Sequence, residues 1–251
     1  MKEKQEILLE TEAETKEGRE IKSKRRPNEK HFKRTDGTYE ARLYSEPVHY
    51  FDEATGSYEE YHPSFHEEAE DFVTENGSFR AKFGKDICRE KAVEVSRNGC
   101  SVAWHPLQWK EHTPPETNAG QFAENSDLPE SAVVKYTAGD SELLYEAGKN
   151  YVRESIVVKK KAPEYRYTFL LYTNGLTAEK EVNCERIQLY QISEDETEAK
   201  KAAFTIPEPY MADASGVCSS AVRYELCEIS QGKYLLQIIA DASWINAEER
   251  V

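Results

Sequence analysis

The chain has 251 residues, of which 33 are basic and 47 acidic, so its formal net charge at pH 7 is -14. A chain of this length can bury about 70–75% of its unfolded surface, which is enough to build a core without disulfides or metals. The negative charge repels phosphate backbones and anionic lipids, so neither nucleic acid nor a membrane surface is expected as a partner. No segment approaches the roughly 20 consecutive apolar residues of a membrane-spanning helix, and no membrane span is predicted.

Residues 1–30 are dense in Glu and Lys and contain one apolar cluster, Ile7 to Leu9. Because so little apolar surface cannot offset the entropy of ordering, this segment is predicted to be a flexible charged leader. It lacks the roughly 7–15-residue apolar core of a secretion signal, so no signal peptide is predicted in this chain.

From Phe32 onward, short segments rich in Tyr, Val, Ile, Phe and Thr are bounded by Gly, Asn, Asp and Pro, which is typical of strands and turns. Residues 39–51 and 57–61 flank a turn-type loop at 52–56, and together they predict a hairpin. Pro47 cannot donate to a sheet, so it predicts an edge or a bulge there.

Further along, residues 78–83 alternate apolar and basic side chains, which is the period of a half-buried strand. Residues 98–130 mix Trp, Pro and polar residues without a period, so they predict an irregular segment with one or two strands. Seven later segments have the length and composition of strands: 133–136, 142–146, 151–158, 165–172, 186–192, 221–229 and 233–239.

These segments follow one another closely, with no helical period between them. The sequence therefore predicts a mainly β fold, an antiparallel β-sandwich or stacked-sheet architecture with little helix. Three parts are predicted: the leader at 1–30, an N-terminal β subdomain with the irregular segment at 31–130, and a C-terminal sandwich-like subdomain at 131–251.

Sequence motifs of known catalytic sites are absent: there is no G-x-S-x-G, P-loop, G-x-G-x-x-G or H-E-x-x-H. All six histidines lie at or before His112, far from the Ser- and Cys-containing stretch 216–220. No catalytic residue and no cofactor is predicted, and the chain is not expected to be an enzyme.

The cysteines form an odd set without a C-x-x-C pair, so buried free thiols are predicted. A single disulfide between Cys218 and Cys227 stays open as an alternative. The set is Cys88, Cys100, Cys184, Cys218 and Cys227.

His49, His62 and His66 are the group most like a binding site, because clustered imidazoles bind transition metals and Asp52 or Glu67 offers a carboxylate. Their spacing matches no known metal motif. Structural histidines are therefore predicted, with a metal site as the alternative.

The stretch FTIPEPYMADASG, residues 204–216, predicts a structural corner. Pro207 and Pro209 cannot donate to a sheet and end the strand at Ile206. Asp213 is placed to accept N–H bonds from the residues that follow it, with Met211 packed beneath. The predicted corner comprises Pro207, Pro209, Met211, Asp213 and Gly216.

The string I-P-x-P-x-M-x-D-A-x-G at 206–216 resembles the β-rich region that precedes the DNRLRE domain in large bacterial wall-associated proteins with RHS (YD) repeats. Residues 44–50 with Asp52 are similar to the opening hairpin of that region, although Tyr58 stands where its relatives tend to carry Trp. The resemblance also rests on the strand segments 134–136, 142–145, 152–157 and 167–169, and on Trp244, Ile245 and residues 249–251.

The resemblance implies a noncatalytic structural or adhesion module of a secreted or cell-surface protein, extracellular or cell-wall associated. Its implied partners are neighbouring domains of a longer surface protein and cell-wall polysaccharide, with carbohydrate binding as the expected contact. A glycan-acting hydrolase with an unrecognised carboxylate pair is the alternative, which would need a groove lined by aromatic rings and two facing acids.

Overall fold

The computed structural model describes residues 18–45, 47–52, 54–61, 64–74, 77–117, 131–193 and 200–247. The chain forms two compact units, Met1–Tyr61 (unit 1) and His62–Val251 (unit 2). All strand pairs of the described residues are antiparallel, and the fold is mainly β with little helix, as predicted.

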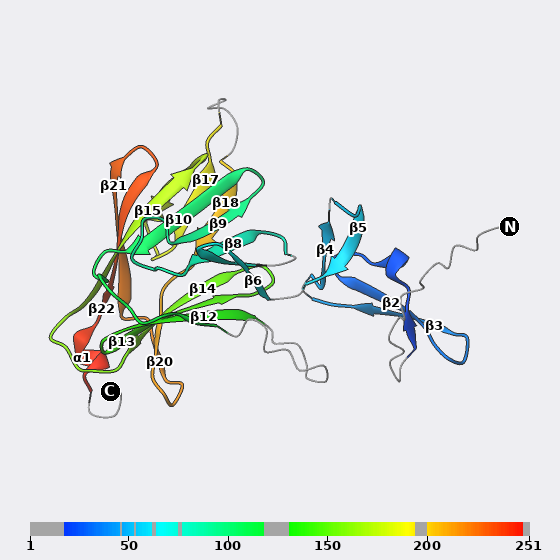
Figure 1. Ribbon diagram of the computed structural model, residues 1–251, viewed down its shortest axis with the longest axis horizontal. Helices are drawn as coiled ribbons and strands as arrows, with labels where there is room; N and C mark the ends of the chain where they lie inside the picture. The colour runs from blue at the N-terminus through cyan, green and yellow to red at the C-terminus, as the bar shows by residue number, and fades with distance from the viewer. Residues whose placement is uncertain are drawn as a thin grey trace. The chain divides into compact units, whose positions relative to one another are not determined.

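Unit 1 contains a three-stranded sheet and a separate hairpin (Figure 1). Phe32 of the sheet is buried, and Arg42 lies over its ring at 4.6 Å. The elements are β1 (Arg19–Glu20), the 3-10 turn η1 (Lys22–Lys24), β2 (Glu29–Lys33), β3 (Tyr39–Leu43), β4 (His49–Asp52) and β5 (Ser57–Glu60).

Part of the segment predicted as a flexible leader is regular in the structure. Residues 18–30 contain β1, η1 and the first two residues of β2. Composition did not reveal this, because β1 is only two residues long and is defined by its pairing with β2. The predicted division into parts at residues 30 and 130 otherwise stays a prediction.

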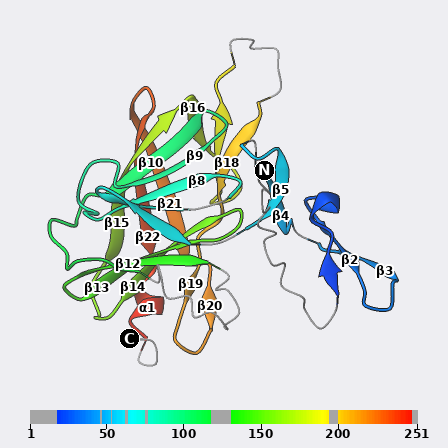
Figure 2. The ribbon, with the colours of Figure 1, turned by 45° about the vertical axis from the view of Figure 1, so that its right-hand side comes forward.

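Unit 2 is built on an eight-stranded sheet with two smaller sheets against it (Figures 1 and 2). In spatial order the large sheet comprises β21 (Val222–Ser230), β22 (Lys233–Ala240), β15 (Tyr165–Asn174), β10 (Cys100–Pro106), β9 (Val93–Arg97), β8 (Arg80–Gly84), β7 (Asp71–Thr74) and β6 (Phe65–Glu68).

The smaller sheets of unit 2 have four, three and two strands, and one short helix follows the last strand. The elements are β11 (Glu116–Thr117), β12 (Ala132–Ala138), β13 (Ser141–Ala147) and β14 (Val152–Val158); β16 (Leu176–Lys180), β17 (Ile187–Gln191) and β18 (Ala202–Ile206); β19 (Met211–Ala212) and β20 (Cys218–Ser219); and α1 (Ala242–Ile245).

The core of unit 2 lies on one face of the eight-stranded sheet. Antiparallel partners share a face, and the pairs Phe83 with Val93 and Leu171 with Tyr234 are buried together. The same cluster contains buried residues of the four-stranded and the three-stranded sheets. These two sheets therefore cover the large sheet, as the stacked-sheet prediction requires.

Alternation of buried and half-buried residues follows the predicted strands closely. In β13, for example, Leu143, Tyr145 and Ala147 are buried, while the residues between them are half-buried. The predicted strand at 39–51 is instead two strands, β3 and β4, which belong to different sheets. The chain turns between them near Pro47, because proline cannot continue a ladder.

The last two long strands, β21 and β22, form a hairpin, and Gly232 makes its turn possible. Its φ is 71°, in the left-handed region that side chains other than glycine rarely adopt. A Cβ atom at this position would also lie 2.9 Å from the carbonyl oxygen of Thr173. The turn between β21 and β22 therefore requires glycine for two independent reasons.

All five cysteines are free, and the alternative disulfide between Cys218 and Cys227 does not form. The prediction that the thiols are buried was wrong, because three of the cysteines are half-buried and Cys218 and Cys227 are exposed. The only α-helix in the described part of the chain, α1, has four residues, and no described helix has the length and apolarity to cross a bilayer.

Asp213 lies in the loop between β19 and β20 and accepts several hydrogen bonds. Its Oδ1 atom accepts from the backbone N–H groups of Ser215 and Val217, both at 2.9 Å, and from the Ser215 hydroxyl at 2.6 Å. Gly216, with a φ of 86°, completes the turn by donating to the Asp213 carbonyl. A single carboxylate oxygen therefore accepts three of the hydrogen bonds that stabilise this turn.

Replacing Asp213 by alanine is expected to lower the free energy of unfolding of unit 2 by about 1–2 kcal/mol, since one side chain serves three donors in an exposed loop. Chemical denaturation followed by tryptophan fluorescence measures this loss. Glu208→Ala, an exposed acid in the preceding segment, is the matched control. Equal stability of the Asp213→Ala and Glu208→Ala variants would show that Asp213 does not stabilise the fold.

Candidate metal centre

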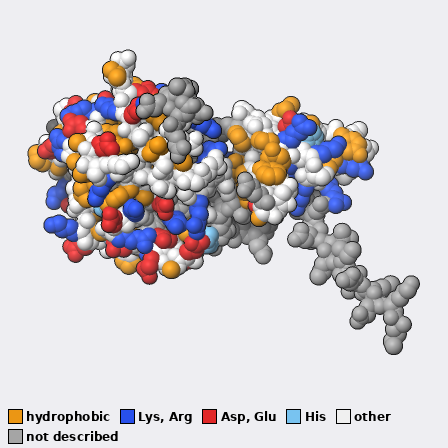
Figure 3. Space-filling view, turned by 90° about the horizontal axis from the view of Figure 1, so that it is seen from above, with side chains coloured by type: hydrophobic (Ala, Val, Ile, Leu, Met, Phe, Trp, Pro, Cys, Tyr) orange, Lys and Arg blue, Asp and Glu red, His pale blue; other side chains and the backbone are white. Residues whose placement is uncertain are grey.

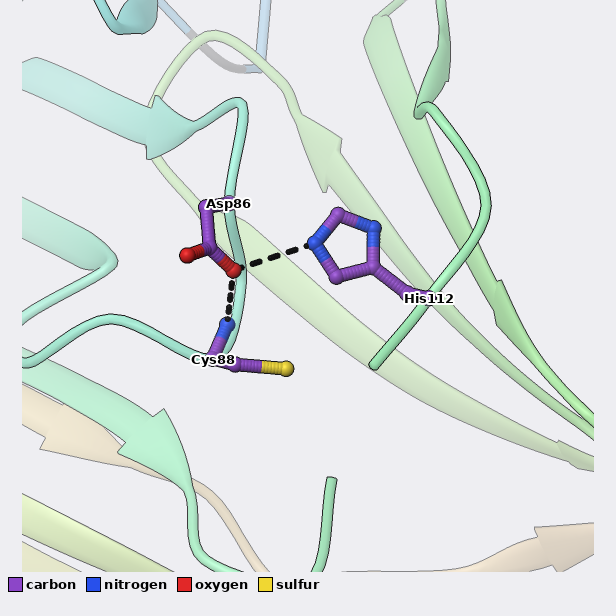
Figure 4. Close-up of side chains that lie close together, drawn as sticks. All are labelled: Asp86, Cys88 and His112. Carbon is purple, nitrogen blue, oxygen red and sulfur yellow. Dashed lines mark hydrogen bonds and ion pairs between the residues drawn. The ribbon is translucent and has the colours of Figure 1, made fainter. Parts of the chain in front are cut away.

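Asp86, Cys88 and His112 lie together in unit 2, with their ligand atoms within 4.8 Å of one another (Figure 4). Asp86 and Cys88 lie in the loop between β8 and β9, and His112 lies in the segment between β10 and β11. The loop is anchored by the fully buried Ile87. Its shape is fixed locally, because Asp86 Oδ1 accepts the backbone N–H of Cys88 at 2.9 Å.

The ring of His112 is fixed by contacts on both of its nitrogens. Nδ1 is 2.6 Å from the carbonyl oxygen of Thr113, and Nε2 is 3.1 Å from Asp86 Oδ1. The backbone N–H of Ile87 also points at Nε2, at 3.3 Å. The ring lies edge-on to Tyr136 with their centroids 5.8 Å apart, and its side chain is 10% exposed.

The charge states of the two loop residues differ. Partial burial raises the pKa of the Asp86 carboxyl, but the Cys88 N–H and His112 lower it further, so the net pKa lies below its ordinary value. Burial and the neighbouring carboxylate raise the pKa of the Cys88 thiol. At neutral pH the Asp86 carboxyl is therefore ionised and the Cys88 thiol is protonated. A carboxylate, a deprotonated thiol and a histidine ring nitrogen are ligands of zinc and other transition metals.

A second group, Glu20, His49 and Glu60, lies in unit 1. His49 is buried, with Nδ1 2.8 Å from the Arg26 carbonyl and Nε2 3.7 Å from Glu20 Oε1. Both carboxylates already have cationic partners: Arg25 binds Glu20 at 2.8 and 3.0 Å, and the Lys30 ammonium contacts Glu60. This group is therefore an ion-pair network of unit 1, whose carboxylates are neutralised without a metal.

The predicted histidine group His49, His62 and His66 is divided in the structure. His49 belongs to the unit 1 network, and His66 in β6 of unit 2 pairs with Glu68 at 2.8 Å. His62 lies outside the described residues. The prediction of structural histidines, and its alternative of a metal site at these three residues, both stay predictions.

The Asp86 site was missed from the sequence, although a signal was present. The D-x-C spacing of Asp86 and Cys88 places a carboxylate and a thiol two residues apart in a loop. The third ligand, His112, is 26 residues from Asp86 and comes from a segment without periodicity. Only the fold brings it to the loop.

A half-buried carboxyl group lies between the two larger sheets of unit 2. Glu154 on β14 accepts the Tyr145 hydroxyl at 2.5 Å and the Trp104 indole N–H at 2.9 Å. Burial raises the pKa of Glu154 above its ordinary value. Because both donors belong to strands packed against it, this group joins β10 to the four-stranded sheet rather than facing a ligand.

A shallow pocket of about 380 Å³ lies at the β9–β10 turn of unit 2. Its lining contains one acid and no aromatic ring: Glu94, Ser96, Arg97, Asn98, Gly99, Cys100, Ser101 and Asn174. A glycan hydrolase would need two facing acids and aromatic rings, so this pocket does not fit the predicted alternative.

Comparisons with known proteins found relatives along almost the whole chain. It is 26% identical over 250 residues, 94% of its length, to a protein of Bacillus subtilis subsp. natto named tRNA(Glu)-specific nuclease WapA. The same identity and coverage hold for the tRNA nuclease WapA of Bacillus subtilis and the tRNA3(Ser)-specific nuclease WapA of Bacillus spizizenii. The chain spans 10% of the length of each relative. No family model matches, and no solved structure matches.

These names correct four predictions: the noncatalytic adhesion module, the lack of enzymatic activity, carbohydrate as a partner and the exclusion of nucleic acid. The prediction about partners was wrong because a net charge of -14 is a sum over all residues of the chain. Such a sum does not describe the local charge of any one surface.

Proposed function

We propose that this chain is a segment of a WapA-like tRNA nuclease, and that the polypeptide to which it belongs acts on tRNA. The observation that carries the proposal is the alignment with the three tRNA nucleases, which extends over 94% of the chain. An alignment of this extent includes residues of both units, so the similarity is not confined to one of them.

The resemblance to the β-rich region before the DNRLRE domain supports a position within a large exported protein, extracellular or wall associated. The mainly β fold agrees with a segment of that kind. The corner at residues 204–216, on which the resemblance depends, is built from a β strand, two prolines and the Asp213 turn.

Unit 1 offers the surface by which an acidic segment can contact RNA. Residues 18–61 contain nine basic and nine acidic residues, so their net charge is zero, whereas that of the whole chain is -14. Arg19, Lys33 and Tyr39 are adjacent across β1, β2 and β3, and all three are exposed. Lys24 adds its ammonium 5.6 Å from the Tyr39 ring.

This combination of groups suits single-stranded or unpaired RNA. Lysine and arginine side chains bind phosphates, and an exposed tyrosine ring, here 67% exposed, can stack on a base. Figure 3 shows Lys and Arg side chains beside hydrophobic ones on this unit. We place the RNA contact of the segment on this face, which we call the β1–β3 face.

The test compares the 251-residue chain with the polypeptide encoded by the complete reading frame that contains it. Each is incubated with total tRNA, with and without divalent metal, and cleavage is followed on denaturing gels. Cleavage by either protein supports the proposal, and the comparison of the two locates the cleavage chemistry inside or outside these residues. Intact tRNA with both proteins, across tRNA pools from several bacteria, would overturn the proposal.

Binding of tRNA to the chain is measured in the same experiment by fluorescence anisotropy at several salt concentrations. The double variant Lys24→Glu/Lys33→Glu is expected to bind at least about tenfold more weakly than the parent and with a smaller salt dependence, because two phosphate contacts are lost. The matched control is Lys159→Glu/Lys160→Glu, which makes the same charge change in unit 2 and leaves the residues of unit 1 intact.

A further inference from the structure

The hydrogen bonds of His112 determine which of its nitrogens can bind a metal. A carbonyl oxygen can only accept, so Nδ1 carries the proton in its 2.6 Å contact with Thr113 O. In the neutral ring, Nε2 then has a lone pair. Metal-binding histidines are commonly oriented in this way: one ring nitrogen binds the metal, and the other donates its proton to a backbone carbonyl.

His112 Nε2 faces one donor and one acceptor. It accepts a hydrogen bond from the backbone N–H of Ile87 at 3.3 Å, which a metal ion would replace. Asp86 Oδ1 lies 3.1 Å from Nε2 and is also an acceptor, so these two atoms repel each other unless a proton or a metal ion lies between them. The Cys88 thiol completes the set from the same loop as Asp86.

We propose that Asp86, Cys88 and His112 bind a zinc ion, with a coordination position left for water. The donor set of one oxygen, one sulfur and one nitrogen suits zinc, whereas magnesium and calcium prefer oxygen alone. The Asp86 side chain is 61% exposed, so it can rotate to shorten its distance to the ion without disturbing the core. Zinc also displaces the thiol proton of Cys88, so binding releases about one proton.

This inference goes beyond the proposed function, because it concerns metal affinity and not the cleavage of RNA. It is tested by titrating the full chain, freed of any purification tag, with Co²⁺ and then with Zn²⁺. A Co²⁺–thiolate site gives a charge-transfer absorption in the near ultraviolet. We expect this band to form at one equivalent and to disappear when Zn²⁺ replaces Co²⁺.

Substitution of Asp86, Cys88 and His112 tests whether these residues produce the Co²⁺ charge-transfer band. Cys88→Ser is expected to abolish it, and His112→Gln and Asp86→Asn are each expected to weaken binding at least about tenfold. Cys184→Ser, which removes another half-buried thiol, and His66→Gln are the matched controls and should leave the affinity unchanged. Circular dichroism shows that each variant is folded, and the Asp86 variant, whose side chain is mostly exposed, serves if Cys88→Ser is unstable.

Absence of the band in the parent protein would overturn the proposal. So would a band that survives Cys88→Ser or is lost in Cys184→Ser. A protonated His112 paired with Asp86 explains the 3.1 Å contact without a metal, and that outcome would be recognised by a nitrogen NMR signal of the imidazolium that Zn²⁺ does not change.

Discussion

Replacing Phe83 by alanine is expected to lower the free energy of unfolding of unit 2 by about 3–5 kcal/mol. Phe83 on β8 is fully buried, and its ring lies 5.4 Å from that of Phe65 and 5.5 Å from that of Tyr145. The contact with Tyr145 joins the eight-stranded sheet to the four-stranded sheet. Truncation would therefore leave a cavity between two sheets that cannot easily collapse.

For a unit of this size, the expected loss corresponds to a melting temperature lowered by roughly 6–20 °C. Tryptophan fluorescence reports on unit 2 alone, since Trp104, Trp109 and Trp244 all belong to it. Tyr210→Ala is the matched control, because it removes an aromatic ring that is 64% exposed. If the two variants melted together, Phe83 would not be part of a packed core.

The second large effect is expected in unit 1, where Arg25→Met should cost roughly 2–4 kcal/mol. The Arg25 side chain is 6% exposed and donates to both carboxylate oxygens of Glu20, while Glu59 lies 3.3 Å away. Methionine preserves the apolar stem but leaves the half-buried Glu20 without its cation. The expected loss of stability is smaller than for a fully buried ion pair, because Glu59 is 41% exposed and is screened by water.

Because residues 1–61 contain no tryptophan, hydrogen exchange of the amides of β2 and β3 is the suitable measurement. Arg34→Met is the matched control: its ion pair with Glu40 is exposed and screened by water, so the expected loss of stability is much smaller. Equal exchange rates in the two variants would show that the Arg25 network does not stabilise unit 1.

The Arg25 network also determines how unit 1 responds to acid. Burial raises the pKa of Glu60, but its contacts with Lys30 and Arg25 lower it further, so its pKa lies below the ordinary value. The stability that Glu60 contributes is therefore complete above the ordinary carboxyl pKa and is lost as the pH falls through the lowered one. Arg25→Met should reduce this acid sensitivity, which hydrogen exchange at several pH values will show.

The sequence by itself determined the fold class and most of the strands of this protein. Alternation along residues 133–136, 142–146 and 165–172 is a local property, since successive side chains of a strand point to opposite faces. The backbone conformation at Gly232 is also a local property, because it depends on the conformational freedom of one residue.

Only the tertiary structure decided which strands are neighbours and which side chains meet. The pairing of β10 with β15 and the contact of Trp104 with Tyr145, 41 residues apart, follow from packing free energy summed over the whole unit. His112 reaches Asp86 by the same means, and Arg25 finds Glu59 only once the strands of unit 1 have assembled. Local sequence patterns do not predict contacts between residues that are far apart in the chain, so the candidate metal centre can be identified only from the folded structure.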